Sequence, residues 1–174
     1  MNKTKNIVIN GIGVALFVAL SMCLRVPVFE NYYLCLGYFV MAIYCYCISP
    51  VSGTIVGVLG TILYCVLING LRGMPGWAMG NIFIGAFLGF GFEFFKLLKG
   101  KVIRYIIMTS CVIIGTFLGI LLVKSSVEMM LYSQPFFLRI TNNIYAFIAD
   151  IFVLLLSIPT CIAIEPSIKK IIKN

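Results

Sequence analysis

Six apolar stretches follow one another along the 174 residues of this chain, each close to the length that crosses a lipid bilayer. They cover about residues 7–24, 33–48, 51–68, 77–98, 105–123 and 140–164. Only 10% of the residues are charged and 62% are hydrophobic, so the chain has too few polar groups to cover the surface of a soluble domain. The sequence predicts an all-α integral membrane protein, a compact bundle of six transmembrane helices that forms a single domain over residues 1–174.

Proline, glycine and polar residues separate these stretches. Pro27 lies in the first break, Ser49-Pro50 divides the second stretch from the third, and residues 69–76 are rich in glycine and proline. A polar excursion over residues 124–135 precedes the last stretch. The second and third stretches are short and share one tight turn, so a re-entrant pair is the alternative to two full spans there. We expect the first stretch to be a retained helix, because no convincing small-residue cleavage site follows it.

The basic residues alternate in a way that predicts the orientation of the bundle. Nine of them fall in segments on the side of the two termini, namely Lys3, Lys5, Lys96, Lys99, Lys101, Arg104, Lys169, Lys170 and Lys173. Four fall on the opposite side, namely Arg25, Arg72, Lys124 and Arg139. The positive-inside rule therefore predicts cytoplasmic N and C termini in the plasma membrane of a bacterium. Topology also accounts for the net charge of +8 without any nucleic-acid partner.

The residue types needed for most catalytic sites are missing. The chain has no histidine, which rules out a histidine-based triad or a histidine metal centre. It has no GxxxxGK[ST] loop and no closely spaced carboxylates that could hold magnesium. The seven cysteines form no CxxC pair and are interpreted as buried, inert thiols. We therefore expect no enzyme activity, no metal and no cofactor, which leaves binding or transport.

Small residues recur every four positions in the first apolar stretch, at Gly11, Ala15 and Ala19. This spacing puts all three on one face of a helix, where another helix can approach closely. The stripe is interpreted as a docking face, whose partner lies either within this chain or in another protein.

Trp77 and Asn81 share a face at the start of the fourth stretch, and Gly85 and Gly89 continue that face with room beneath them. A tryptophan offers a flat surface on which a ring can stack, and an asparagine amide both donates and accepts hydrogen bonds. These two residues are candidate ligand contacts. The alternative is an interfacial tryptophan and an asparagine bonded to a neighbouring helix.

The last stretch carries a second group of polar candidates. Asn143 and Asp150 are seven residues apart and share a helix face, and Asn142 lies beside them. A carboxylate within a span is costly, about 2.5–3.5 kcal/mol on insertion scales, so Asp150 is expected to face the bundle interior. Its partner is either a donor on the substrate or a cation, for which the candidates are Arg25, Arg72 and Arg139.

Arg72 and Arg139 are candidates to attract a polar or anionic ligand, because a guanidinium group binds carboxylates bidentately. The alternative is that they are solvated at the rim. Both fall on the predicted outer side, as do the loops after the first, third and fifth stretches. This convergence predicts a binding site that opens to the exterior.

Two segments resemble a known family. Ala15-Leu16-Phe17-Val18-Ala19 is similar to the alanine-rich motif in the first helix of substrate-binding S components of energy-coupling factor (ECF) transporters. The stretch from Pro75 to Gly85 is similar to the opening of the fourth helix in some of these proteins. Length, six spans, cytoplasmic termini and a basic fourth loop also match.

The resemblance implies high-affinity capture of a small water-soluble vitamin or related heterocyclic micronutrient. The S component would dock on a transmembrane coupling protein, the T component, which rests on two ATP-binding cassette ATPases. Ala15 and Ala19 would contact the T component, and the outer ends of helices four to six would hold the ligand. The alternative is a self-contained secondary carrier or channel, although the chain shows no clear repeat and Asp150 is its only deep charge.

Overall fold

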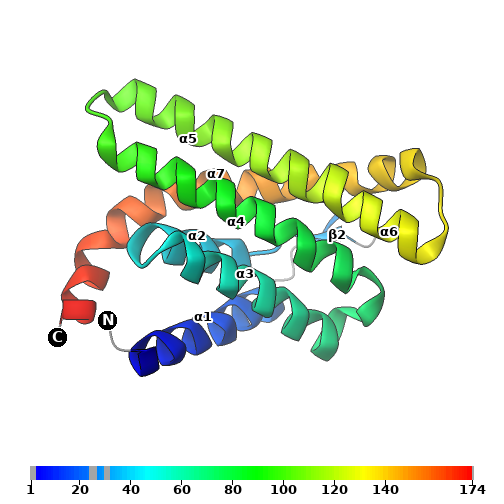
Figure 1. Cartoon of the computed structure of the whole chain (residues 1–174), viewed down its shortest axis with the longest axis horizontal. Helices are drawn as coiled ribbons and strands as arrows, with labels where there is room; N and C mark the ends of the chain where they lie inside the picture. The colour runs from blue at the N-terminus through cyan, green and yellow to red at the C-terminus, as the bar shows by residue number, and fades with distance from the viewer. Residues whose placement is uncertain (1–2, 24–26, 30–31, 174) are drawn as a thin grey trace.

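The computed structural model describes residues 3–23, 27–29 and 32–173, which are almost entirely helical (Figure 1). Along the chain, the helices and strands are α1 (Lys3–Cys23), β1 (Pro27–Phe29), β2 (Tyr32–Tyr33), α2 (Gly37–Cys47), α3 (Pro50–Tyr64), the π-helix η1 (Cys65–Asn69), the 3-10 helix η2 (Leu71–Gly73), α4 (Met74–Leu97), α5 (Lys101–Thr116), the π-helix η3 (Phe117–Lys124), α6 (Ser125–Tyr132) and α7 (Phe136–Lys173). Several of these follow one another without a break, so the described residues form six helical rods.

Five of these rods are long and apolar enough to cross a membrane. The exception is α2, an apolar helix of 11 residues where the sequence predicted a span over residues 33–48. The antiparallel strands β1 and β2 form the segment just before it. A helical fold with five helices that are long and apolar enough to span a membrane is thus confirmed, with one short pair of strands added, whereas a full crossing by α2 stays a prediction.

The turn between α2 and α3 follows directly from its sequence. Ser49 has an extended backbone and its hydroxyl accepts a hydrogen bond from the Ser52 amide at 3.1 Å, which caps the first turn of α3. Pro50 occupies the first turn, where its missing N–H costs nothing. Two helices are therefore joined almost without a loop.

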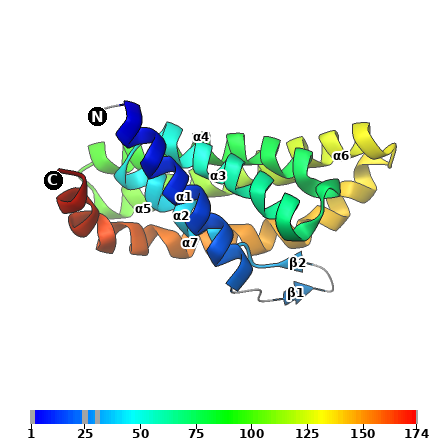
Figure 2. The same cartoon turned by 90° about the horizontal axis from the view of Figure 1, so that it is seen from below.

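Both ends of the described chain lie at one end of the bundle, together with the α2–α3 and α4–α5 turns (left in Figure 1). The strands, η2 and the α6–α7 turn lie at the opposite end, and the view from below agrees (Figure 2). This arrangement matches the alternation of the six predicted stretches. It brings the first, third and fifth connections together.

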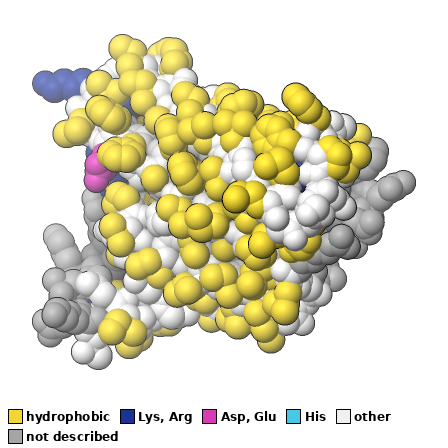
Figure 3. Space-filling view, turned by 45° about the vertical axis from the view of Figure 1, so that its right-hand side comes forward, with side chains coloured by type: hydrophobic (Ala, Val, Ile, Leu, Met, Phe, Trp, Pro, Cys, Tyr) yellow, Lys and Arg dark blue, Asp and Glu magenta, His cyan; other side chains and the backbone are white. Residues whose placement is uncertain are grey.

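Glycines on α3 allow its helix to pack closely on its neighbours. A Cβ at Gly53 would meet the Cys45 backbone nitrogen at 2.6 Å, and one at Gly60 would meet the Phe17 ring at 2.6 Å. This face of α3 is therefore filled by α2 and α1. The outside of the molecule is largely apolar: hydrophobic side chains cover most of the face in Figure 3, and the clearly visible charges lie at its left edge.

The polar excursion predicted over residues 124–135 is mostly helix. The rod of α5, η3 and α6 runs on to Tyr132, where Ser133 takes a left-handed conformation with φ 51° and ends it. The prediction of a loop from Lys124 onward is wrong, because the polar residues at the start of this segment lie within a helix. Ser125 and Glu128 are buried instead, and they pair with a side chain of α7.

The last helix is also longer than predicted. It begins at Phe136, directly after Pro135, and continues past residue 164 to Lys173 with Pro159 and Pro166 inside it. Proline removes a backbone donor and bends a helix. The C-terminal part of α7 turns towards the start of α1 in both views (Figures 1 and 2).

Candidate functional site

Three side chains form a hydrogen-bonded chain near the end of the bundle that carries η2. The Trp77 Nε1–H donates to the Tyr38 hydroxyl at 2.9 Å, and this hydroxyl donates to Asn81 Oδ1 at 2.8 Å. Tyr38 and Asn81 are fully buried, while Trp77 remains partly exposed. The Trp77 ring also meets Tyr64 edge-on, with centroids 6.0 Å apart. The two residues predicted from the fourth stretch are thus brought together by Tyr38, which the sequence did not single out.

The amide of Asn81 ties three helices together. Its Nδ2 donates to Thr61 Oγ1 at 2.7 Å and to the Gly57 carbonyl at 3.1 Å, both on α3. Both amide donors are therefore used within the protein, and Oδ1 takes the bond from α2. Asn81 holds Tyr38, and through it Trp77, in a fixed position.

Asp150 joins this group from α7. It is 5% exposed and lies near the Tyr38 hydroxyl, and Lys124 is a positive charge close enough to act on it. A phenol carries one proton, so Tyr38 cannot donate to Asn81 and Asp150 at once. Asp150 therefore has acceptor capacity that the Tyr38 hydroxyl does not fill. As predicted, this carboxylate faces the interior.

Of the cations proposed as partners for Asp150, Arg139 is engaged elsewhere. Its Nη1 lies 3.7 Å from Glu128 Oε2, and its guanidinium carbon lies 5.8 Å from the centre of the Tyr132 ring. The buried Arg139 Nε has no hydrogen-bond partner. Arg25 lies outside the described residues, as does the side chain of Arg72.

Asn143 belongs to the same cluster as Arg139. It is 3% exposed, and its Nδ2 donates to Ser125 Oγ at 3.0 Å and to Glu128 Oε2 at 3.2 Å. The neighbouring Asn142 is exposed, so one asparagine lies in the interior and the other lies on the surface. Among the described residues, the buried polar residues that the sequence predicted thus form two groups, and the exposed Asn142 lies outside both. One surrounds Tyr38, the other surrounds Glu128, and Lys124 lies next to Ser125 at the junction.

The space expected beneath Trp77 and Asn81 is filled. A Cβ on Gly85 would stand 2.4 Å from Thr54 Oγ1, and one on Gly89 would stand 2.4 Å from Pro50 Cβ. These two glycines serve close packing of α4 on α3, because the start of α3 occupies the room that the sequence left open. The prediction of a hollow face there was wrong.

Several residues of these two groups were missed by the sequence reasoning. They are Tyr38, Thr61, Ser125 and Glu128, all buried and polar. Glu128 had a detectable signal, since it is an acidic residue with helical spacing to Ser125 and Lys124. Tyr38 had none, because it sits among the aromatic residues of an apolar stretch and only the fold places its hydroxyl between Trp77 and Asn81.

The small-residue stripe on α1 lies away from all of these contacts. Gly11, Ala15 and Ala19 are exposed, and a Cβ on Gly11 would have no atom within 4 Å. The opposite face of α1 packs inward through Phe17 and Ser21. The described part of the chain therefore provides no partner for the stripe.

Comparisons with known proteins agree with this architecture. A family model described as "ECF-type riboflavin transporter, S component" matches residues 1–164. The UPF0397 protein of Lactococcus lactis subsp. cremoris (strain NZ9000) is 29% identical over 145 residues, which cover 77% of this chain and 75% of that protein. UPF0397 protein YdcD of Lactococcus lactis subsp. lactis (strain IL1403) is 28% identical over 145 residues, which again cover 77% of this chain and 75% of that protein.

The family match extends over most of the chain and includes both polar groups and the exposed stripe. Together with five apolar helices, it fits a multi-pass protein of the cell membrane. Proteins of this kind serve the uptake of vitamins and related micronutrients and are not enzymes. The chain belongs to the family of S components of ECF-type riboflavin transporters.

Proposed function

We propose that this chain captures a small water-soluble vitamin or related heterocyclic micronutrient from outside the cell, as the S component of an ATP-driven importer. The proposal includes six membrane crossings with both termini in the cytoplasm. Nine of the 13 basic residues fall on the side of the termini, which supports that orientation. Trp77, Asp150 and Arg139 then belong to the half of the bundle nearer the exterior.

The arrangement around Tyr38 carries the proposal. Trp77 is partly exposed and is held by its one hydrogen bond to Tyr38, so its ring is a preformed surface for stacking. Asp150 retains acceptor capacity in a buried position, which favours a ligand with ring N–H or hydroxyl donors. A flat heterocycle with polar edge groups meets both requirements.

The proposed site keeps the residues expected from the sequence, some as direct ligand contacts and others as residues that position those contacts. They are Arg72, Trp77, Asn81, Arg139, Asn142, Asn143 and Asp150. Asn81 acts by holding Tyr38 and Trp77, since its own amide donors are already used. Arg139 offers a buried Nε–H without a protein acceptor, which suits a carbonyl or carboxylate oxygen of the ligand.

Release to the cell requires partners. The exposed stripe of Gly11, Ala15 and Ala19 is the proposed contact with the T component, which would couple this chain to two ATPases. A smooth surface without protruding side chains allows a helix to dock and withdraw. No nucleotide-binding loop is present in this chain, so the energy for import would come from those partners.

Two experiments test the proposal. Uptake of labelled vitamins is measured in cells with and without the ATPase module, and accumulation against a gradient is expected only with it. Undiminished accumulation without the module would instead support a self-contained carrier. Mass spectrometry of the purified protein identifies the ligand that it retains.

Trp77 supplies an independent readout, because it is the sole tryptophan of the chain. Its fluorescence reports on the site without any label. A vitamin that stacks on the ring should quench this emission with a midpoint at the dissociation constant measured by calorimetry. Binding that leaves the emission unchanged would contradict the assignment of the site, whatever the uptake assay shows.

A further inference from the structure

The inward face of α1 reaches the candidate ligand site through two adjacent residues. Phe17 and Val18 lie between Ala15 and Ala19 in the sequence, yet Phe17 is 0% exposed and Val18 is 5% exposed. Ala15 and Ala19 are exposed. The same turn of α1 therefore presents small residues to the outside of the molecule and large residues to its interior.

Phe17 holds the ring of Tyr38. The two rings meet edge-on, with centroids 6.2 Å apart and an angle of 80° between their planes. Aromatic pairs prefer this geometry, so the Phe17 ring favours one orientation of the Tyr38 ring. Phe17 is itself fixed between α2 and α3, because its Cδ1 would lie 2.8 Å from a Cβ on Gly37 and 2.6 Å from one on Gly60. A ring of α1 thus helps to aim the Tyr38 hydroxyl at Trp77.

Val18 supports the other partner of that hydrogen bond. It forms a small buried cluster with Tyr64 and Cys65, where α3 ends and η1 begins, and Trp77 packs against this cluster. The Tyr64 and Trp77 rings meet edge-on, with an angle of 90° between their planes. α1 therefore supports both Tyr38 and Trp77, the first by a direct ring contact and the second through the cluster that contains Tyr64.

We propose that Phe17 and Val18 are positioning residues of the ligand site, a role that rests on the function proposed above. They act through Tyr38 and Tyr64 and do not contact the ligand. Phe17 orients Tyr38, Val18 holds Tyr64 against Trp77, and Trp77 keeps its stacking surface only while α1 packs against α2 and α3. A shift of α1 away from α3 loosens the Trp77 ring and lowers ligand affinity.

Quenching of Trp77 emission by acrylamide tests this role without any ligand, because Trp77 is the sole tryptophan of the chain. Phe17→Leu and Val18→Ala are compared in the full purified chain with Val14→Ala, which truncates a partly buried valine one turn earlier on α1. The first two variants are expected to raise the quenching constant about twofold, since local packing around the ring loosens, and Val14→Ala should keep the wild-type value. Wild-type quenching in both Phe17→Leu and Val18→Ala, or an equal rise in Val14→Ala, would overturn the proposal.

Two glycine variants separate displacement of the Phe17 ring from displacement of α1 in general. Gly60→Ala places a methyl group against the Phe17 ring, whereas Gly13→Ala places one against Tyr44 and Val56. Both crowd the packing of α1, but only Gly60→Ala is expected to raise the quenching constant. The double variant Gly60→Ala/Phe17→Leu should match Phe17→Leu alone, because both changes act on one ring. Additive effects, or equal quenching in the two glycine variants, would overturn the role of Phe17.

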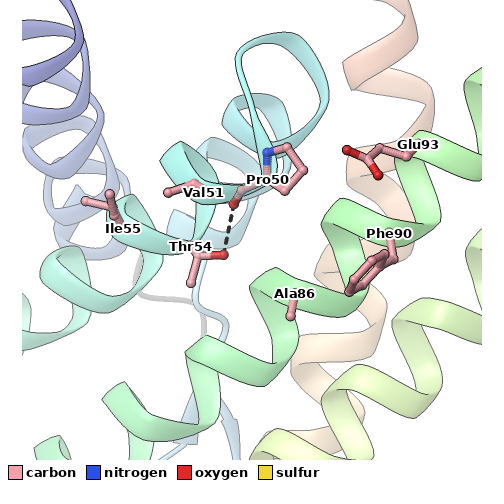
Figure 4. A pocket seen from close by; sticks show the side chains of 7 residues that line it. All are labelled: Pro50, Val51, Thr54, Ile55, Ala86, Phe90 and Glu93. Carbon is pink, nitrogen blue, oxygen red and sulfur yellow. Dashed lines mark hydrogen bonds between the residues drawn. The ribbon is translucent and has the colours of Figure 1, made fainter. Parts of the chain in front are cut away.

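Ligand affinity supplies the second readout. The vitamin identified by mass spectrometry of the purified protein is titrated by calorimetry, and Phe17→Leu is expected to weaken its binding about fivefold, the loss of one edge-on aromatic pair. Ala86→Leu is the control on α4. Ala86 lies nine residues after Trp77, on the opposite side of the helix, and lines a surface groove of about 480 Å³ between α3 and α4 (Figure 4). This variant should leave both quenching and affinity unchanged.

The two readouts distinguish failure of the positioning role from failure of the proposed function. If the wild-type chain binds a vitamin and Phe17→Leu binds it equally well, the positioning role fails and the proposed function stands. If the wild-type chain binds no vitamin, the proposed function fails, and acrylamide quenching still decides whether Phe17 and Val18 position Trp77.

Discussion

The backbone of Gly80 on α4 lies directly against that of Gly119 on η3. A Cβ built on Gly80 would stand 2.5 Å from the Gly119 carbonyl oxygen, and one built on Gly119 would stand 2.6 Å from the Gly80 carbonyl oxygen. This contact fixes α4 against the rod that carries Ser125 and Glu128. It therefore sets the spacing between the two polar groups of the candidate site.

Gly80→Ala should destabilise the protein by about 1–3 kcal/mol, because the added methyl group meets backbone and the two helices must separate. Gly11→Ala is the matched control on α1, where nothing lies within 4 Å, and should be neutral or stabilise by up to about 1 kcal/mol. Unfolding of both variants in detergent measures the difference. If Gly80→Ala were as stable as Gly11→Ala, the α4–η3 contact would be able to widen at little energetic cost.

Tyr38→Phe should both destabilise the protein and weaken ligand binding. It leaves the Trp77 Nε1–H and Asn81 Oδ1 without their partner, at about 1–3 kcal/mol for each buried group. Tyr105→Phe keeps an exposed ring against Phe95 and serves as the control for loss of a hydroxyl. Thermal unfolding and calorimetry on both variants make the comparison. If Tyr38→Phe bound the ligand with wild-type affinity, Tyr38 would have no role in the proposed binding site.

Trp77→Ala should weaken ligand binding about tenfold or more, since it removes the stacking surface. Asn81→Ala should weaken binding too, and it should also lower stability, because Asn81 holds α2, α3 and α4 together. The dissociation constant of the isolated protein is the relevant measurement. Unchanged affinity in both variants would mean that the ligand binds elsewhere.

Ala15→Trp or Ala19→Trp should abolish assembly with the T component and leave ligand affinity intact. The stripe is exposed, so a large side chain meets the docking partner and not the core of this chain. Leu156→Trp, on an α7 position that is 47% exposed, is the control. Co-purification with the T component measures assembly. A folded variant that loses ligand affinity would show that the stripe serves internal packing.

The pairing of Glu128 with Arg139 can be separated from a role in ligand binding by a double-mutant cycle. Glu128→Gln and Arg139→Gln should each destabilise the protein, because each leaves a charge in a largely buried position. The double variant should recover part of the loss. If only Arg139→Gln weakens binding, the unpartnered Nε is the group that contacts the ligand. If the two losses of stability simply add, the ion pair contributes nothing measurable.

Most of the helices could be predicted because length and hydropathy are local properties. The second stretch was the least certain, and α2 is indeed the short helix of the bundle. The prediction of a loop after Lys124 was wrong because polar residues in a sequence can form either a solvated turn or a buried hydrogen-bonded pair. Ser125 and Glu128 are buried polar residues, and both accept a hydrogen bond from the Asn143 amide.

The candidate site was predicted in part. Trp77 and Asn81 do share a helix face, and Asp150 is buried as the cost of a charge in lipid requires. Their link through Tyr38 depends on how α2 packs between α4 and α7, which no spacing along the chain encodes. For the same reason the sequence could not show that α3 fills the space beside Gly85 and Gly89.

The sequence by itself determined three features of this protein. It is a membrane protein, its basic residues alternate between the two ends of the predicted spans, and α1 carries a stripe of small residues. Each follows from composition or helical period alone. Only the tertiary structure decided that the glycines of α3 and α4 are covered while Gly11, Ala15 and Ala19 remain open. The physical reason is that a small residue permits close approach, but the neighbouring helices decide whether anything approaches.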